Sequence, residues 1–167
     1  MNINVLTGEL QPDMNDVATE VQKIAMRIGR YQLNATHDTK QGFTLEPKPP
    51  MALDMPGIYG IYRKRTLLYI GSGYMHTRIS RFVKEVQGNS RLDENFPAAK
   101  KYRTMWGSNL EGVEIMFCPY FESDDGYPID VIEAFLIQKL QPLLNTKRGF
   151  SKKFRSRRSP PKRKLNP

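Results

Sequence analysis

The chain has 167 residues, of which 39% are hydrophobic, and its 26 Lys and Arg outnumber its 17 Asp and Glu, for a net charge of +9. This composition suits one folded domain with extensions and excludes wholesale disorder. The single cysteine, Cys118, excludes a disulfide framework and a Cys-x-x-Cys zinc or redox site. No apolar stretch approaches the roughly 18 residues of a membrane span, and the first residues do not resemble a signal peptide. We therefore expect an intracellular protein, in the cytoplasm or nucleoid, with no membrane partner.

The N-terminal segment, residues 1–52, is expected to be a helical extension of the main domain. Apolar residues recur at helical spacing over 17–28, which predicts a helix that runs to about Tyr31 or Leu33. Residues 34–56 contain several prolines and are interpreted as irregular. We expect the extension to complete the core. Its helix is also a candidate face for a homodimer.

The main domain is expected over residues 53–146. Two runs rich in β-branched and aromatic residues, 57–62 and 67–70, are joined by a connection short enough for a hairpin. The following pattern predicts a helix ending near Gly88, a loop over 88–97, a short helix over 98–106, a strand over 113–117, an acidic turn over 122–126 and a last helix over 129–140. This order predicts an α+β fold, in which helices flank a small, mainly antiparallel three-stranded sheet.

The C-terminal tail, residues 147–167, carries the net charge of the chain. It has ten basic side chains and no acidic one, which leaves 16 basic against 17 acidic side chains elsewhere. Such a run of like charge is typical of a nucleic-acid-binding arm, with a solubilising tail as the alternative. Phe150 and Phe154 add rings on which bases can stack. The tail residues predicted to bind nucleic acid are Lys147, Arg148, Lys152, Lys153, Arg155, Arg157 and Arg158.

Five elements of the main domain, taken in order, resemble the signature of the GIY-YIG nuclease superfamily. Gly57-Ile58-Tyr59 and Tyr69-Ile70-Gly71 are separated by nine residues and lie in the two strands predicted for the hairpin. Arg78 follows at the start of the next helix, Glu133 lies in the last helix, and Asn145 ends a Pro-x-x-Asn element. The resemblance covers roughly residues 56–146 and implies a small stand-alone endonuclease.

The residue types also suit phosphodiester chemistry by themselves. Arg78 offers permanently charged, forked donors that match phosphate oxygens. Glu133 is a hard oxygen ligand suited to Mg²⁺ or Mn²⁺, which would bind substrate phosphate and water as well. The resemblance implies Tyr59 as the base for a nucleophilic water and Tyr69 as a hydrogen-bond partner of the water or phosphate. With an ordinary pKa of about 10, a tyrosine needs a nearby cation or metal ion for that task.

Four further residues are assigned supporting roles. Asn145 is expected to hold the glutamate or the backbone around the site, with a plain turn residue as the alternative. Gly71 suits a close approach of the backbone to a ligand. Arg81 and Lys84 are expected to contact the phosphates of the nucleic acid rather than to take part in the chemistry.

The chain departs from the family's pattern at two places. The stretch from Tyr69 to Arg78 is one residue shorter than in many relatives. Where many members carry an additional catalytic His or Tyr, this chain has Phe82, which can neither donate nor accept a proton. We consider His76 as a substitute that acts from the loop before the helix, against a loop histidine without a role.

Taken together, the sequence predicts a metal-dependent endonuclease of homing, restriction or repair type that hydrolyses phosphodiester bonds in DNA. In this interpretation water attacks with the help of tyrosine, while Arg78 and a metal ion at Glu133 stabilise the transition state. A non-catalytic nucleic-acid-binding module on the same fold is one alternative, and Phe82 supports it. A structure-selective RNA nuclease is another, because phosphate chemistry does not reveal the sugar.

Overall fold

The computed structural model describes residues 2–3, 10–11, 14–25, 29–36, 42–49, 55–89, 96–120 and 127–145. The acidic turn expected at 122–126, most of the loop expected at 88–97, and the tail lie outside these ranges. The helices and strands are β1 (Asn2–Ile3), β2 (Leu10–Gln11), α1 (Met14–Ala25), β3 (Gly29–Ala35), β4 (Phe43–Glu46), β5 (Pro56–Arg63), β6 (Thr66–Tyr74), α2 (Met75–Gln87), α3 (Pro97–Trp106), β7 (Val113–Pro119) and α4 (Ile129–Leu140).

Five of the described strands form one antiparallel sheet in the order β4-β3-β7-β5-β6. The central pairing of β5 places Tyr59 opposite Gly71 of β6 and opposite Phe117 of β7. Strand β6 is therefore an edge of the sheet, and its last residues lead directly into α2. Because side chains alternate between the two faces of a strand, this register decides which residues can meet.

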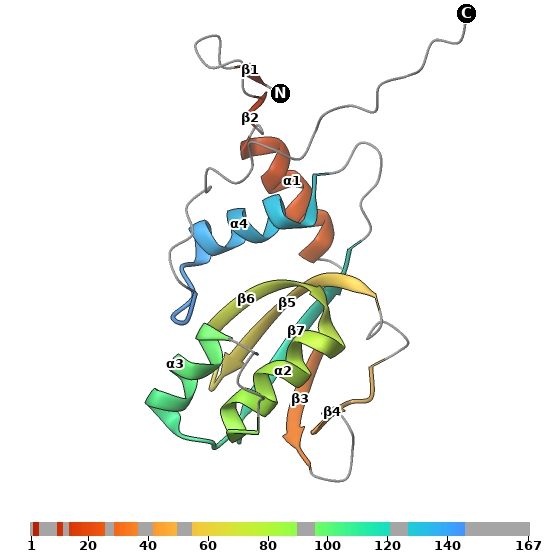
Figure 1. Cartoon of the computed structure of the whole chain (residues 1–167). Coiled ribbons are helices and arrows are strands. Elements are labelled where there is room, and N and C mark those ends of the chain that lie inside the picture. The colour runs from red at the N-terminus through yellow and green to blue at the C-terminus, as the bar shows by residue number, and fades with distance from the viewer. Residues whose placement is uncertain are drawn as a thin grey trace, which may run out of the picture.

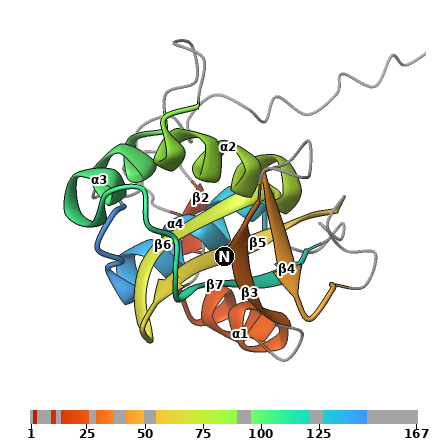
Figure 2. The same cartoon turned by 90° about the horizontal axis from the view of Figure 1, so that it is seen from below.

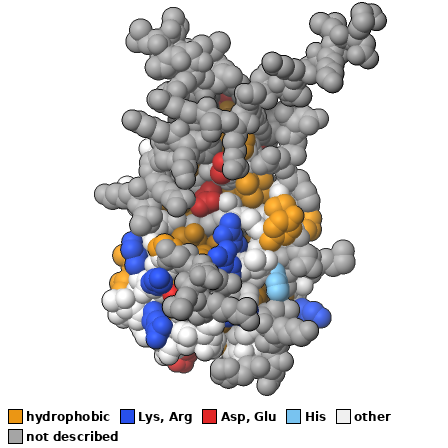
Figure 3. Space-filling view, in the orientation of Figure 1, with side chains coloured by type: hydrophobic (Ala, Val, Ile, Leu, Met, Phe, Trp, Pro, Cys, Tyr) orange, Lys and Arg blue, Asp and Glu red, His pale blue; other side chains and the backbone are white. Residues whose placement is uncertain are grey.

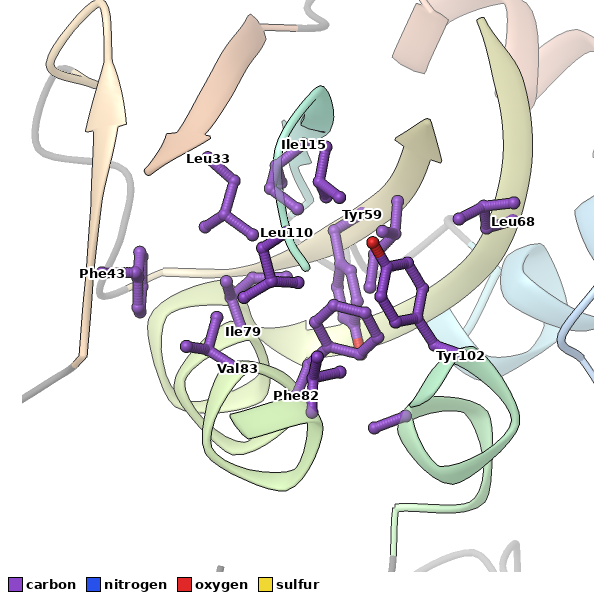
Figure 4. Packing of buried hydrophobic residues seen from close by; sticks show 14 of the residues in the cluster. Leu33, Phe43, Tyr59, Leu68, Ile79, Phe82, Val83, Tyr102, Leu110 and Ile115 are labelled. Carbon is purple, nitrogen blue, oxygen red and sulfur yellow. The ribbon is translucent and has the colours of Figure 1, made fainter. Parts of the chain in front are cut away.

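Helices cover both faces of the sheet, with α1 and α4 on one side and α2 and α3 on the other (Figures 1 and 2). Each pair of helices buries its own cluster of apolar side chains against the sheet. On the α2/α3 side, Phe82 of α2 and Tyr102 of α3 face each other edge to face, with their ring centroids 5.4 Å apart. Tyr59 extends from β5 toward α2 in the same cluster (Figure 4). Two cores, one on each face, thus fix both helix layers relative to the sheet.

The expected α+β class is confirmed, but the expected three-stranded sheet is wrong. The segment expected as a helical extension contains α1 and also β3 and β4, which widen the sheet to five strands. The first helix ends at Ala25 instead of running to Tyr31 or Leu33. In β3 those two side chains are buried, whereas the polar residues that alternate with them, Arg30, Gln32 and Asn34, are more exposed. This alternation has the period of a strand, and β3 covers an edge of β7 that would otherwise present unpaired backbone groups.

The other expected elements are confirmed to within a few residues. The hairpin between β5 and β6 turns at Lys64 and Arg65, whose φ angles of 46° and 67° are those of a two-residue turn that matches the twist of a hairpin. The helices expected near 79–88, 98–106 and 129–140 are α2, α3 and α4. None of the helices described here has the length and hydrophobicity to cross a membrane.

Candidate active site

The two predicted catalytic tyrosines lie side by side on the α2/α3 face of the sheet. Tyr59 pairs with Gly71, and Tyr69 is two residues before that glycine, so the two side chains point to the same face. Their ring centroids are 6.0 Å apart. Tyr59 is only 1% exposed, whereas Tyr69 is partly buried and packs against the core with Phe96. Of the pair, Tyr69 is the more accessible.

Gly71 is required at its position because the tyrosines fill the space above it. A Cβ atom built on Gly71 would lie 2.5 Å from the Cζ and Oη atoms of Tyr59 and 2.8 Å from Cε1 of Tyr69. Such separations are far shorter than a van der Waals contact between carbon atoms. We expected this glycine to admit a ligand; the structure instead fills the space above it with the two rings, which a side chain here would displace.

Arg78 contacts the same strand at Gly73, two residues after Gly71. It is the fourth residue of α2, as expected for the start of that helix, and its side chain is exposed. A Cβ atom on Gly73 would lie 3.3 Å from the Nε atom of Arg78, so the guanidinium packs against the backbone of Gly73. Gly73 has a φ angle of 115°, which side-chain-bearing residues rarely adopt. The end of β6 is thus shaped to place Arg78 at the surface.

Glu133 reaches the strand from the opposite face, where α4 packs. It is partly buried, and its Oε2 atom accepts a hydrogen bond from the hydroxyl of Ser72. Sequence reasoning missed Ser72. The sequence feature that could have identified it is a polar residue between two glycines of a strand, two residues after the buried Ile70 and therefore on the same face. Three consecutive residues, 71–73, therefore contact the tyrosines, the glutamate and the arginine in turn.

The pKa of Tyr59 is shifted by its burial and by the charged and polar groups around it. Burial of the hydroxyl raises this pKa well above 10.0, and the neighbouring Tyr69 and the charge of Glu133 raise it further. The positive charge of Arg78 lowers it, without offsetting the other effects. A hydrogen bond with Tyr69 also favours the neutral form. Tyr59 is therefore a neutral hydroxyl near pH 7, although charges from both α2 and α4 act on it.

Asn145 holds the outer edge of β6. Its Nδ2 atom donates to the carbonyl of Ile70 at 2.8 Å, and its Oδ1 atom accepts from the Ile70 N–H at 2.9 Å. The N–H of Leu144 also donates to the carbonyl of Leu68 at 2.7 Å. Of the two roles considered for Asn145, these bonds match the one that holds backbone around the site.

The remaining predicted residues lie differently from our expectation. His76 is the second residue of α2 and not a loop residue, and its ring centroid is 5.8 Å from that of Phe43 on β4. The helix starts earlier than expected because β6 continues to Tyr74 and passes into it directly. Phe82 is fully buried between Phe96 and Tyr102, which explains an apolar residue there.

On the face shown in Figure 3, basic side chains spread over the part of the surface formed by α2 and α3, and acidic side chains lie near α4 and at the lower end of the molecule. Arg81 and Lys84, expected to contact phosphates, are partly buried on α2. The Nε atom of Arg81 is buried and has no hydrogen-bond partner within the described ranges. The tail residues expected to bind nucleic acid follow shortly after Asn145, the last residue of the final described range.

The side chains around residues 71–73 fit one kind of divalent metal site and not another. Among the residues that the structure describes, no three His, Cys, Asp or Glu side chains gather into a cluster that could hold a metal ion. Mg²⁺, however, is commonly held by one or two carboxylates together with substrate phosphate and water. Glu133 accepts a hydrogen bond from Ser72, and its charge, like that of Arg78, acts on Tyr59, so it fits that kind of site. A cage built entirely from described protein ligands does not fit.

Comparison of the chain with protein-family models, curated proteins and solved structures finds no significant match.

Proposed function

We propose that the chain is a metal-dependent endonuclease of the GIY-YIG type, which acts inside the cell and hydrolyses phosphodiester bonds in DNA. The observation that carries this proposal is that residues 71–73 of the edge strand β6 are contacted by side chains from four elements: two tyrosines and an arginine, and a glutamate from the opposite face. Such a combination of a cation, a hard oxygen ligand and hydroxyl groups is suited to a phosphate that gains negative charge in the transition state.

Each side chain has a role in this proposal. The exposed guanidinium of Arg78 binds phosphate oxygens through paired donors, and its charge is permanent. Glu133 would hold the divalent metal ion, which when bound supplies positive charge for the phosphate and the departing oxygen. Asn145 and Ser72 do not touch the substrate; they fix the strand and the carboxylate. Proximity and orientation of this kind lower the entropic cost of the reaction.

The state of Tyr59 defines how the tyrosines take part. A neutral hydroxyl can accept the proton of an attacking water only after it has lost its own proton, and burial opposes that loss. Arg78 and any further positive charge favour the loss. Tyr69, the more accessible of the two, is placed to hydrogen-bond the water or phosphate, and Tyr59 behind it makes a hydrogen bond to its hydroxyl. The base role for Tyr59 therefore depends on bound metal and substrate.

A non-catalytic nucleic-acid-binding module is the second candidate, and two observations favour it. Tyr59 is almost fully buried with a raised pKa, and Phe82 is a core residue where a further proton-transferring side chain would be expected. Such a module would still use Arg78 and the basic tail for contacts with phosphates.

Binding and cleavage of the same labelled DNA duplex, measured side by side in Mg²⁺, separate the two candidates. If the chain is a nuclease, Glu133→Gln cuts about 100-fold more slowly or worse, because the metal ion contributes several kcal/mol, and it still binds the duplex. Glu111→Gln, in the exposed turn before β7, is the matched control and keeps both properties. Binding by the wild type without cleavage, unchanged in Glu133→Gln, would favour the binding module.

A further inference from the structure

Ser72 has no role in the sequence motif, yet its hydroxyl donates a hydrogen bond to the carboxylate of Glu133. We propose that Ser72 is a positioning residue, whose hydroxyl holds the Glu133 carboxylate in the orientation needed to bind a divalent metal ion. This inference rests on the proposed function and adds to it the residue that sets the affinity for the metal.

The register of β6 places the serine where it can do this. Ser72 pairs with Ile58 of β5 and follows Ile70 by two residues, so all three side chains point to the α4 face. Ile58 and Ile70 are buried there against apolar residues of α4. Ser72 is thus a polar member of an otherwise apolar row, and its hydroxyl donates to Oε2 of Glu133.

The neighbours of Ser72 explain why this contact serves the site. Gly71 lies under the two tyrosines, and Gly73 lies against the guanidinium of Arg78. The hydrogen bond from Ser72, which lies between these two glycines, therefore places the Glu133 carboxylate at the same short stretch of β6. Loss of this bond removes one restraint on the partly buried glutamate side chain, and the metal ion would then have to supply that restraint on binding.

The chemistry of the contact is that of an outer-shell partner of a metal ligand. A serine hydroxyl donates to a carboxylate without neutralising its charge, so Glu133 remains an anionic oxygen ligand. Hydrogen bonds of this type fix the direction of a metal-binding carboxylate, and their removal typically lowers metal affinity or activity by roughly 10- to 100-fold.

Three variants test the inference. Ser72→Ala removes the hydroxyl, Ser72→Thr keeps it on a residue that suits a strand, and Ser108→Ala changes an exposed serine after α3. For each, Mn²⁺ affinity is measured from the electron paramagnetic resonance signal of free Mn²⁺ in the presence of duplex DNA. The Mg²⁺ dependence of single-turnover cleavage and the thermal unfolding midpoint without metal are measured as well.

We expect Ser72→Ala to need about 10- to 100-fold more metal for half-saturation, with a much smaller change in the cleavage rate at saturating metal. Ser72→Thr recovers most of the affinity, and Ser108→Ala equals the wild type. An unchanged metal affinity in Ser72→Ala, with or without a lower unfolding midpoint, would show that the bond only stabilises the packing of α4 on β6. That result would overturn this inference but not the proposed function. If Glu133→Gln also binds Mn²⁺ as tightly as the wild type, Glu133 is not a ligand, and the proposed function falls with it.

Discussion

Asn145 pairs with the backbone of Ile70 in the way that a neighbouring strand would, with one hydrogen bond accepted at 2.9 Å and one donated at 2.8 Å. Ile70 lies on the edge strand between Tyr69 and Gly71, so these bonds occupy backbone groups that would otherwise be unpaired. Asn145 thereby stiffens the strand that carries the candidate site.

Replacing Asn145 by Ala should lower both stability and activity. The change leaves a donor and an acceptor of Ile70 without their partner, which costs about 1–3 kcal/mol in the free energy of unfolding. Denaturant unfolding measures this cost, and cleavage of a DNA duplex should slow in parallel. Asn89→Ala, at an exposed position after α2, is the control and should stay within about 0.5 kcal/mol of the wild type. An Asn145→Ala protein as stable as the wild type would show that water replaces the amide without cost.

Gly71→Ala should disrupt the tyrosine pair. The new methyl group would lie 2.5 Å from the ring of Tyr59, so the rings or the strand must move, at a cost of about 1–3 kcal/mol, typical of overpacking. The rate of cleavage should fall by more than the loss of folded protein explains, because both tyrosines are displaced. Gly60→Ala, on the opposite face of β5, is the control: its methyl group meets the ring of Tyr62 at 3.0 Å, a milder contact. Equal losses in the two variants would contradict a special role for Gly71.

Much of the fold could be predicted because local patterns agreed with the final packing. The β5–β6 hairpin has two short aromatic and β-branched runs, and α4 has apolar residues at helical spacing up to Pro142. Strands β3 and β4 could not be predicted in this way. The helical spacing of α1 extends past its true end, and the alternation of β3 covers only seven residues. Pairing with β7, a long-range effect, decides the structure of that segment.

The candidate site was predictable in its residue types but not in its burial or its supporting contacts. The motif picked out Tyr59 and Arg78, yet the near-complete burial of Tyr59 depends on how α2 and α3 cover the sheet. His76 was placed in a loop because nothing in the sequence shows that β6 passes directly into α2. Ser72 was overlooked because its importance comes from the helix that packs over it, more than sixty residues away in the chain.

The pKa of Tyr59 makes a prediction about alkaline stability. In the unfolded chain its hydroxyl ionises near pH 10, whereas the folded protein keeps the proton to higher pH. The resulting stabilisation is complete below about pH 10 and is lost as the pH rises above it toward the folded-state pKa. Tyr59→Phe lacks this contribution, so its free energy of unfolding should fall less steeply above pH 10, by up to about 1.4 kcal/mol per pH unit.

Denaturant unfolding at a series of pH values from neutral to alkaline measures these slopes. Tyr74→Phe is the control, because Tyr74 is 56% exposed at the end of β6; its slope should equal that of the wild type. Equal slopes for the wild type and Tyr59→Phe would mean that Tyr59 ionises as freely in the folded protein as in the unfolded chain.

Deleting residues 147–167 should weaken DNA binding and reduce its dependence on salt. The deletion removes ten basic side chains. For each phosphate that the shortened protein no longer neutralises, the slope of log affinity against log salt should become shallower by about 0.9 for a duplex. A tail of the same composition in scrambled order is the control and should keep the slope, since the effect is electrostatic. An unchanged slope after deletion would assign the tail to solubility.

The most direct test of the proposed nuclease activity is the nicking of supercoiled plasmid by the wild type and by Arg78→Ala, each with Mg²⁺ and with excess chelator. Arg30→Ala is the control, because Arg30 is an exposed arginine that pairs with Glu114 on the far part of the sheet. We predict Mg²⁺-dependent nicking by the wild type and by Arg30→Ala, and its loss in Arg78→Ala. No cleavage of supercoiled, linear or branched DNA by the wild type in Mg²⁺ or Mn²⁺ would contradict a nuclease and favour a nucleic-acid-binding module.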